Sequence, residues 1–145
     1  MKILVGVDDS KISEDVLRAI VTQFPTQNTE VRVLHVLQPM SPSAPPQMAV
    51  GYAPELEDQK KGAREIVERV ASKLRSAGFQ VDTAVEIGDI RERIIDSAAE
   101  WRANLIVLGS HGQRGIRRFL LGSVAEFVAR HARCSVEIVR APAGM

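Results

Sequence analysis

Two glycine-containing turns near the carboxyl end have the spacing expected of a phosphate-binding site. The apolar run 105–108 ends at Gly109-Ser110-His111-Gly112, and nine residues separate Gly112 from Gly122-Ser123, where a helical pattern begins. Glycine lets the backbone approach a ligand without a Cβ in the way. The start of a helix offers unpaired N–H groups and the positive end of the helix dipole, and both attract anions. We therefore predict that these turns bind phosphate.

The turns do not match two common phosphate motifs. A Walker P-loop has lysine between its last glycine and Ser/Thr, whereas Ser123 follows Gly122 directly. A dinucleotide fingerprint has Gly-x-Gly-x-x-Gly, whereas Gly109, Gly112 and Gly115 are each separated by two residues. A different type of nucleotide site is expected.

Length and composition favour one domain, 1–145, of an ordinary globular protein. The chain has 145 residues, of which 45% are hydrophobic and 26% charged. No apolar run approaches the roughly 20 residues of a membrane span, and the short apolar start does not suit a signal peptide. We expect a cytoplasmic protein, and the single Cys134 suits a reducing compartment. A net charge of +1 argues against general affinity for nucleic acid.

Apolar runs and helical patterns alternate along the chain. The expected strands cover 2–7, 31–37, 79–87, 105–108 and the residues around Val136 and Ile138, and the expected helices lie between them. Asp89 with Glu92, and Ser123 with Glu126, have capping-box spacing for the last two helices. Strict alternation requires crossovers, which predicts an α/β fold: a mainly parallel five-stranded sheet with helices on both faces.

The segment from Gln38 to Pro54 carries five prolines and one glycine. We predict an exposed loop there, and a helix that starts at Glu55 and ends at Gly78. His35, within the preceding apolar strand, is expected to be a satisfied interior residue rather than a metal ligand.

Ligands of parallel sheets bind beyond the carboxyl ends of the strands. Asp8 and Gly109 both follow predicted strands, so the two ends and the helix at Ser123 would line one crevice if the first and fourth strands are neighbours. Periodicity alone leaves the strand order open. Asp8 could instead cap the first helix, and Ser123 could act as a plain N-cap.

The spacing Gly109-x2-Gly112-x9-Gly122-Ser123 resembles the ATP-binding signature of the universal stress protein family. The resemblance extends over nearly the whole chain, and its most specific parts are 109–112, 120–126 and 131–136. It implies a three-layer, Rossmann-like fold, similar to that of adenine nucleotide alpha hydrolases, with strand order 3-2-1-4-5.

The resemblance also implies a ligand and the residues that bind it. Adenine and sugar would lie on Val7, Asp8 and Val36, and Leu108 would also belong to the nucleotide-binding residues. The phosphate contacts would be Gly109, His111, Gly112, Gly122, Ser123 and Val124. The ligand would be ATP, with Mg²⁺ or Mn²⁺ held mainly by its phosphates. The resemblance further implies a homodimer joined through the last strand.

Two residues depart from the family pattern in the last strand. Ser135 stands where proline is usual, and Glu137 stands where an aliphatic residue is common. A charge on an edge strand could weaken the dimer contact.

Three functions stay open at this point. A dimer that holds a nucleotide could signal stress to an unknown protein partner. The 38–54 segment would then be the place where partner contact responds to nucleotide occupancy. The protein could be a slow ATPase or adenylyl transferase, although the sequence offers no clear catalytic residue and no metal-ligand cluster. It could also be a scaffold that binds no nucleotide. The intact spacing of Gly109, Gly112 and Gly122 argues against this third function.

Overall fold

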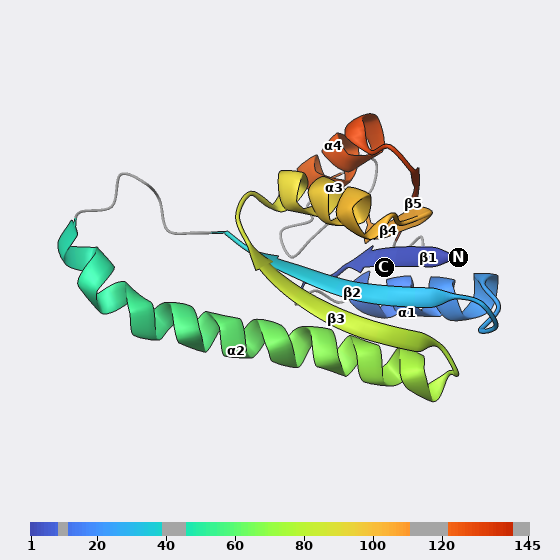
Figure 1. The fold of residues 1–145 in the computed structure, drawn as a ribbon, viewed down its shortest axis with the longest axis horizontal. Helices are drawn as coiled ribbons and strands as arrows, with labels where there is room; N and C mark the ends of the chain where they lie inside the picture. The colour runs from blue at the N-terminus through green and yellow to red at the C-terminus, as the bar shows by residue number, and fades with distance from the viewer. Residues whose placement is uncertain (9–11, 39–45, 111–121, 141–145) are drawn as a thin grey trace.

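The computed structural model describes residues 1–8, 12–38, 46–110 and 122–140. Strands and helices alternate through these residues (Figure 1). The strands are β1 (Lys2–Gly6), β2 (Glu30–Leu37), β3 (Gln80–Ile87), β4 (Leu105–Gly109) and β5 (Ser135–Val139). The helices are α1 (Ile12–Gln23), α2 (Pro46–Ser76), α3 (Ile90–Trp101) and α4 (Ser123–His131).

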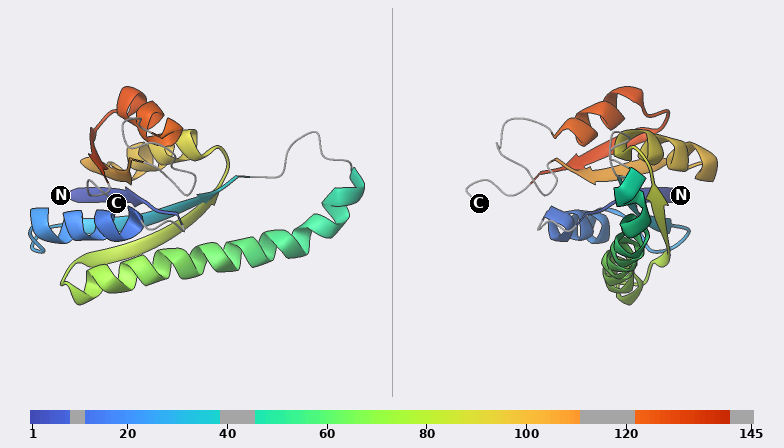
Figure 2. Two further views of the ribbon diagram at one scale, coloured as in Figure 1. Left: turned by 180° about the vertical axis from the view of Figure 1, so that it is seen from behind. Right: turned by 90° about the vertical axis from the view of Figure 1, so that its left-hand side faces the viewer.

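The strands form one five-stranded sheet in the order β3-β2-β1-β4-β5, and every pairing is parallel. Helices α1 and α2 cover one face, and α3 and α4 cover the other (Figure 2). The predicted α/β class and the strand order implied by the resemblance are both confirmed. Because all strands run the same way, the residues that follow β1, β2 and β4 emerge at one end of the sheet.

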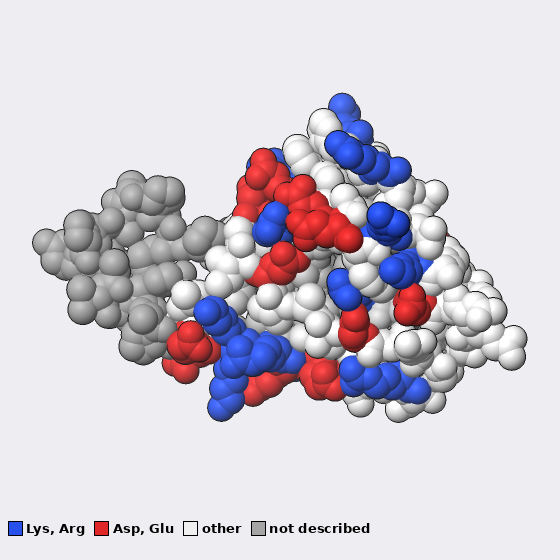
Figure 3. All heavy atoms as spheres, viewed as in Figure 1, with Lys and Arg blue, Asp and Glu red and all other residues white. Residues whose placement is uncertain are grey.

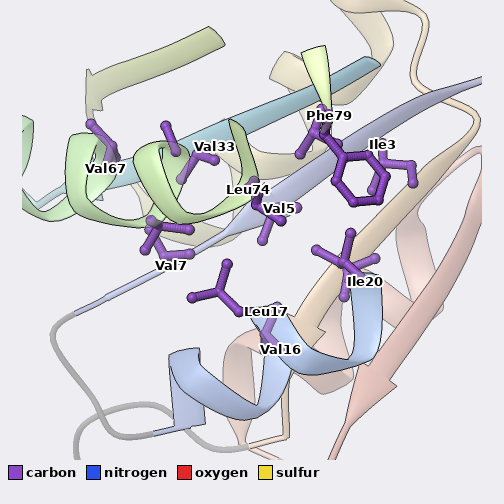
Figure 4. Packing of buried hydrophobic residues seen from close by; sticks show 14 of the residues in the cluster. Ile3, Val5, Val7, Val16, Leu17, Ile20, Val33, Val67, Leu74 and Phe79 are labelled. Atoms are coloured by element: carbon purple, nitrogen blue, oxygen red, sulfur yellow. The ribbon is translucent and has the colours of Figure 1, made fainter. Parts of the chain in front are cut away.

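Alternation along the buried strands builds two hydrophobic cores. Ile3 and Val5 of β1 pack towards α1 and α2, with Ile20 and Leu74 from those helices (Figure 4). Leu4, between them, packs on the opposite face with Ile94 and Val128 from α3 and α4. Strand β1 is thus buried on both faces, as its continuous apolar sequence predicts. It gives the site a rigid base.

Helix α2 differs from its prediction. It begins at Pro46 rather than Glu55 and has 31 residues, so the second half of the predicted loop is helical. The first helical position needs no N–H partner, and proline is favoured there. Residues 39–45, the other part of the predicted loop, lie outside the described residues. Within the described part of the chain, no helix has the length and apolar character to cross a bilayer.

Candidate functional site

Strands β1 and β4 are neighbours at the centre of the sheet. Ile3 pairs with Leu105, and Val5 pairs with Val107. The residues after β1, the end of β4 and the start of α4 therefore lie at one end of the sheet, which was the condition for a single crevice. Val36 approaches the same end from β2, because Gly6 and Leu34 are in register.

Two backbone hydrogen bonds of Ser110 link the end of β4 to β5 and to the start of α4. Ser110 N donates to Val139 O at 2.8 Å, and Gly122 N donates to Ser110 O at 2.6 Å. Ser110 is 3% exposed. Sequence reasoning did not select Ser110; its only signal was its position between Gly109 and His111. The bond from Gly122 holds the N-cap of α4 at the carboxyl end of β4.

The N-terminus of α4 has no side-chain cap. The N-cap is Gly122, whose carbonyl accepts from Glu126 N at 3.0 Å, and no side-chain cap hydrogen bond is present. The prediction that Ser123 is the N-cap is wrong, because the first turn already closes on Gly122 and Ser123 is the first helical residue. The N–H groups of Ser123, Val124 and Ala125 lack intrahelical acceptors, as in any first turn. Within the described residues, Gly122 supplies no side-chain acceptor for them.

Backbone conformation does not require glycine at position 122. Its φ of −65° and ψ of 156° suit any L-amino acid. What glycine contributes here is the absence of a side chain, which leaves the backbone donors of α4 uncovered. An aspartate or serine at this place would cap the helix itself.

Three of the predicted contact residues are buried at this end of the sheet. Val7 and Val36 are each 8% exposed, and Leu108 is 5% exposed. A Cβ on Gly6 would lie 2.6 Å from Leu108 Cδ2, so this glycine lets Leu108 pack against β1. Gly6 was not selected from the sequence, although a glycine inside an apolar strand signals a close approach.

His35 contacts the chain just before Asp8. Its Nδ1 lies 2.8 Å from Val7 O. The expectation of a satisfied interior histidine is confirmed, and the ring is half-buried. Asp8 itself is also half-buried at the end of β1.

Some predicted positions cannot be compared with the structure. His111 and Gly112 lie outside the described residues. Among the described residues, no three His, Cys, Asp or Glu side chains gather closely enough to hold a metal ion.

The face of the molecule drawn in Figure 3 carries charges of both signs. Lys and Arg side chains gather along α2, while Asp and Glu side chains gather above them over α3 (Figure 3). A shallow groove between α2 and β3 brings Lys61 and Arg64 near Thr83 and Ile87, but Glu65 also lines it. This groove is remote from α4 and offers no helix N-terminus, so we do not assign phosphate binding to it.

Comparisons with known proteins identify the family of this chain. The universal stress protein family matches residues 1–140. A universal stress protein of Synechocystis sp. is 31% identical over 149 residues, covering 96% of this chain and 97% of the relative. The universal stress protein YxiE of Bacillus subtilis is 32% identical over 145 residues, covering 96% and 98%.

Solved structures share the fold. The structure of the hypothetical protein MJ0577 has a TM-score of 0.84 and 27% identity, covering 99% of this chain and 97% of its own. A universal stress protein from Archaeoglobus fulgidus in complex with dAMP has a TM-score of 0.68 and 26% identity, covering 96% and 97%. A universal stress protein in complex with cAMP has a TM-score of 0.67 and 25% identity, covering 97% and 96%. On the family match and the curated relatives, this chain belongs to the universal stress protein family.

Proposed function

We propose that the protein binds ATP at the end of the sheet and acts through nucleotide occupancy in a stress response. The observation that carries the proposal is the uncapped N-terminus of α4, attached to the end of β4 through Ser110 and Gly122. A polyphosphate is the natural partner of such an end, because it can accept from several N–H groups at once. The relatives with bound dAMP and cAMP support an adenine nucleotide as the ligand class.

The proposed contacts with the nucleotide follow from where each residue lies at the carboxyl end of the sheet. Ser123 and Val124 would donate backbone N–H groups to phosphate, with Gly109 and Gly122 allowing close approach. The same turn would include His111 and Gly112. Asp8 would accept from a sugar hydroxyl, and Val7 and Val36 would contact adenine. Leu108 would lie beside the nucleotide at the end of β4, directly before the turn at Gly109. Mg²⁺ or Mn²⁺ would be held mainly by phosphate oxygens, since the described residues form no cluster of three metal ligands.

We also propose a homodimer joined through β5. This strand pairs only with β4 among the described strands, so its other edge is open to a second copy. Glu137 does not obstruct that edge: its carboxylate accepts from Gln23 Nε2 at 3.1 Å, which directs the charge towards α1. Nucleotide occupancy would alter the surface around 38–54, and a protein partner would bind there. We further propose that the protein acts in the cytoplasm.

Ligand-dependent melting tests nucleotide binding. ATP with Mg²⁺ at about 100 times its dissociation constant adds roughly 2.7 kcal/mol of stability, which should raise the melting temperature by several degrees. Adenosine at the same concentration is the control for base binding without phosphate. No shift with ATP at any ratio of Mg²⁺ would contradict the proposal, and mass analysis of the purified protein would show whether a nucleotide is carried through purification.

Measuring the release of phosphate from ATP distinguishes a protein that only binds ATP from one that hydrolyses it. Asp8 is the only carboxylate among the proposed site residues, and we assign it to the sugar rather than to water activation. The expected result is stable occupancy with at most slow release. Release that persists unchanged in Asp8→Ala would indicate a contaminating enzyme, whereas fast release abolished by that change would favour an ATPase.

A further inference from the structure

The hydrogen-bond ladder between β1 and β2 changes at its carboxyl end. Val7 N donates to Leu34 O at 2.9 Å, which continues the ladder one residue beyond β1. The backbone groups of Leu34 face β1, and those of Leu37 face β3, because Leu37 O accepts from Gly88 N. Val36 lies two residues after Leu34, so its N–H also faces β1. A regular parallel ladder would pair this N–H with Val7 O.

The donor found at Val7 O is the His35 ring. Its Nδ1 is 2.8 Å from Val7 O, and a carbonyl oxygen can only accept, so Nδ1 carries the proton and donates. Within the described residues, no hydrogen bond joins Val36 N–H to Val7 O. Val36 is buried, and a buried backbone donor without its partner is costly. The β2 end is thus left with a donor directed at the end of β1.

The same contact orients the chain as it enters Asp8. The Val7 carbonyl and the Asp8 N–H belong to one planar peptide unit. Fixing the carbonyl against the His35 ring therefore fixes the direction of the Asp8 N–H and the start of the turn. One side chain outside the proposed contact residues controls two of them.

We propose that His35 is a positioning residue of the nucleotide site. By holding Val7 O against its ring and out of the ladder, it leaves Val36 N–H for an acceptor nitrogen of a heteroaromatic base, and it orients Asp8 for the sugar. This inference rests on the proposed function, because the ligand is the adenine nucleotide proposed above. His35 itself touches no ligand atom.

Two amide side chains separate this role from simple packing. The amide nitrogen of asparagine reaches the place of Nδ1, whereas that of glutamine reaches the place of Nε2. The His35→Asn variant would therefore keep the bond to Val7 O, and the His35→Gln variant would lose it. We compare both with His35→Leu by calorimetric titration with ATP and Mg²⁺. We expect near wild-type affinity for His35→Asn and roughly tenfold weaker binding for the other two.

A ligand-independent measurement accompanies the titration. Nitrogen-15 NMR of the apo protein should find the neutral His35 ring protonated at Nδ1. On addition of ATP, the Val36 amide should shift in wild type and in His35→Asn. Melting curves of each variant establish that the fold is retained, and the asparagine and glutamine variants decide the question if His35→Leu does not fold.

The outcomes distinguish this inference from the function on which it rests. Equal affinity in His35→Gln and wild type, equal loss in His35→Asn and His35→Gln, or a ring protonated at Nε2 would overturn the positioning role while leaving nucleotide binding intact. Absence of ATP binding by the wild-type chain, with the ring protonated at Nδ1, would instead contradict the proposed function and remove the ligand from this inference.

Discussion

Helices α3 and α4 lie on the same face of the sheet but begin in different ways. At α3, the Asp89 carboxylate accepts from Arg91 N at 3.0 Å and from Glu92 N at 3.2 Å. At α4, the N-cap is Gly122, and no side chain caps the first turn. The chain therefore satisfies one helix start with its own carboxylate and leaves the other open. The cap of α3 stabilises the fold, whereas the proposed function assigns the start of α4 to the phosphates of a ligand.

The strongest test of this difference gives α4 the cap that α3 has. Gly122→Asp should lower ATP affinity by about 100-fold, because its carboxylate would bond the N–H groups and repel phosphate. Its melting temperature should not fall, since the φ and ψ of Gly122 suit aspartate. Calorimetry measures the affinity.

A neutral cap of the same shape separates the two causes. Gly122→Asn blocks the same donors without adding charge, so it should bind ATP more tightly than Gly122→Asp and less tightly than wild type. Wild-type affinity in both variants would show that α4 does not hold the phosphates.

The Asp8→Ala variant tests how much of the ATP affinity comes from residues outside α4. Loss of a charge-assisted hydrogen bond to the sugar should weaken ATP binding about tenfold, a smaller effect than that of Gly122→Asp. Equilibrium titration of ATP and of inorganic triphosphate checks it, because the triphosphate lacks the sugar and should be indifferent to the change. A similar loss for both ligands would contradict the assignment of Asp8 to the sugar.

The reciprocal change removes the cap of α3. Asp89→Ala should lower the melting temperature by a few degrees, because two first-turn N–H groups lose their acceptor. ATP affinity should stay at the wild-type value. Asp89→Ser, which retains a capping oxygen, should recover most of the stability. Weaker ATP binding in Asp89→Ala would show that the two helix starts are not independent.

Acid titration gives the smallest expected effect. The Glu92 N–H, with help from Arg91, holds the pKa of Asp89 below its ordinary value of 3.8. A lowered pKa in the folded state stabilises the protein above the unfolded pKa, and this contribution is lost as pH falls through the folded pKa. The difference in melting temperature between wild type and Asp89→Ala should therefore be constant above about pH 5 and shrink below pH 3.8. A difference that grows in acid would contradict this sign.

Sequence patterns predicted the sheet well because they depend on burial. The apolar runs of β1 and β4 correspond to strands buried on both faces, and alternation in β3 corresponds to its place at the edge. The Asp89 cap was also predicted, since its oxygen bonds residues nearby in sequence. Strand order came from the family resemblance, because periodicity carries no information on which strands pair.

The failures have two physical causes. Ser123 with Glu126 has the same spacing as Asp89 with Glu92, yet the bond from Gly122 N to Ser110 O places the start of α4 at Gly122. That contact depends on tertiary structure. The start of α2 was predicted too late because Pro46 was treated as a helix breaker, although it occupies the first helical position. Neither His35 nor Ser110 has a local pattern that reveals its bond.

Amide NMR during nucleotide titration tests the central claim most directly. ATP should shift the backbone N–H signals of Ser123, Val124 and Ala125, adenosine should leave them in place, and the Arg91 and Glu92 signals should respond to neither. Equal shifts with ATP and adenosine, or a response at α3 in place of α4, would contradict the account of α4 as the phosphate-binding end.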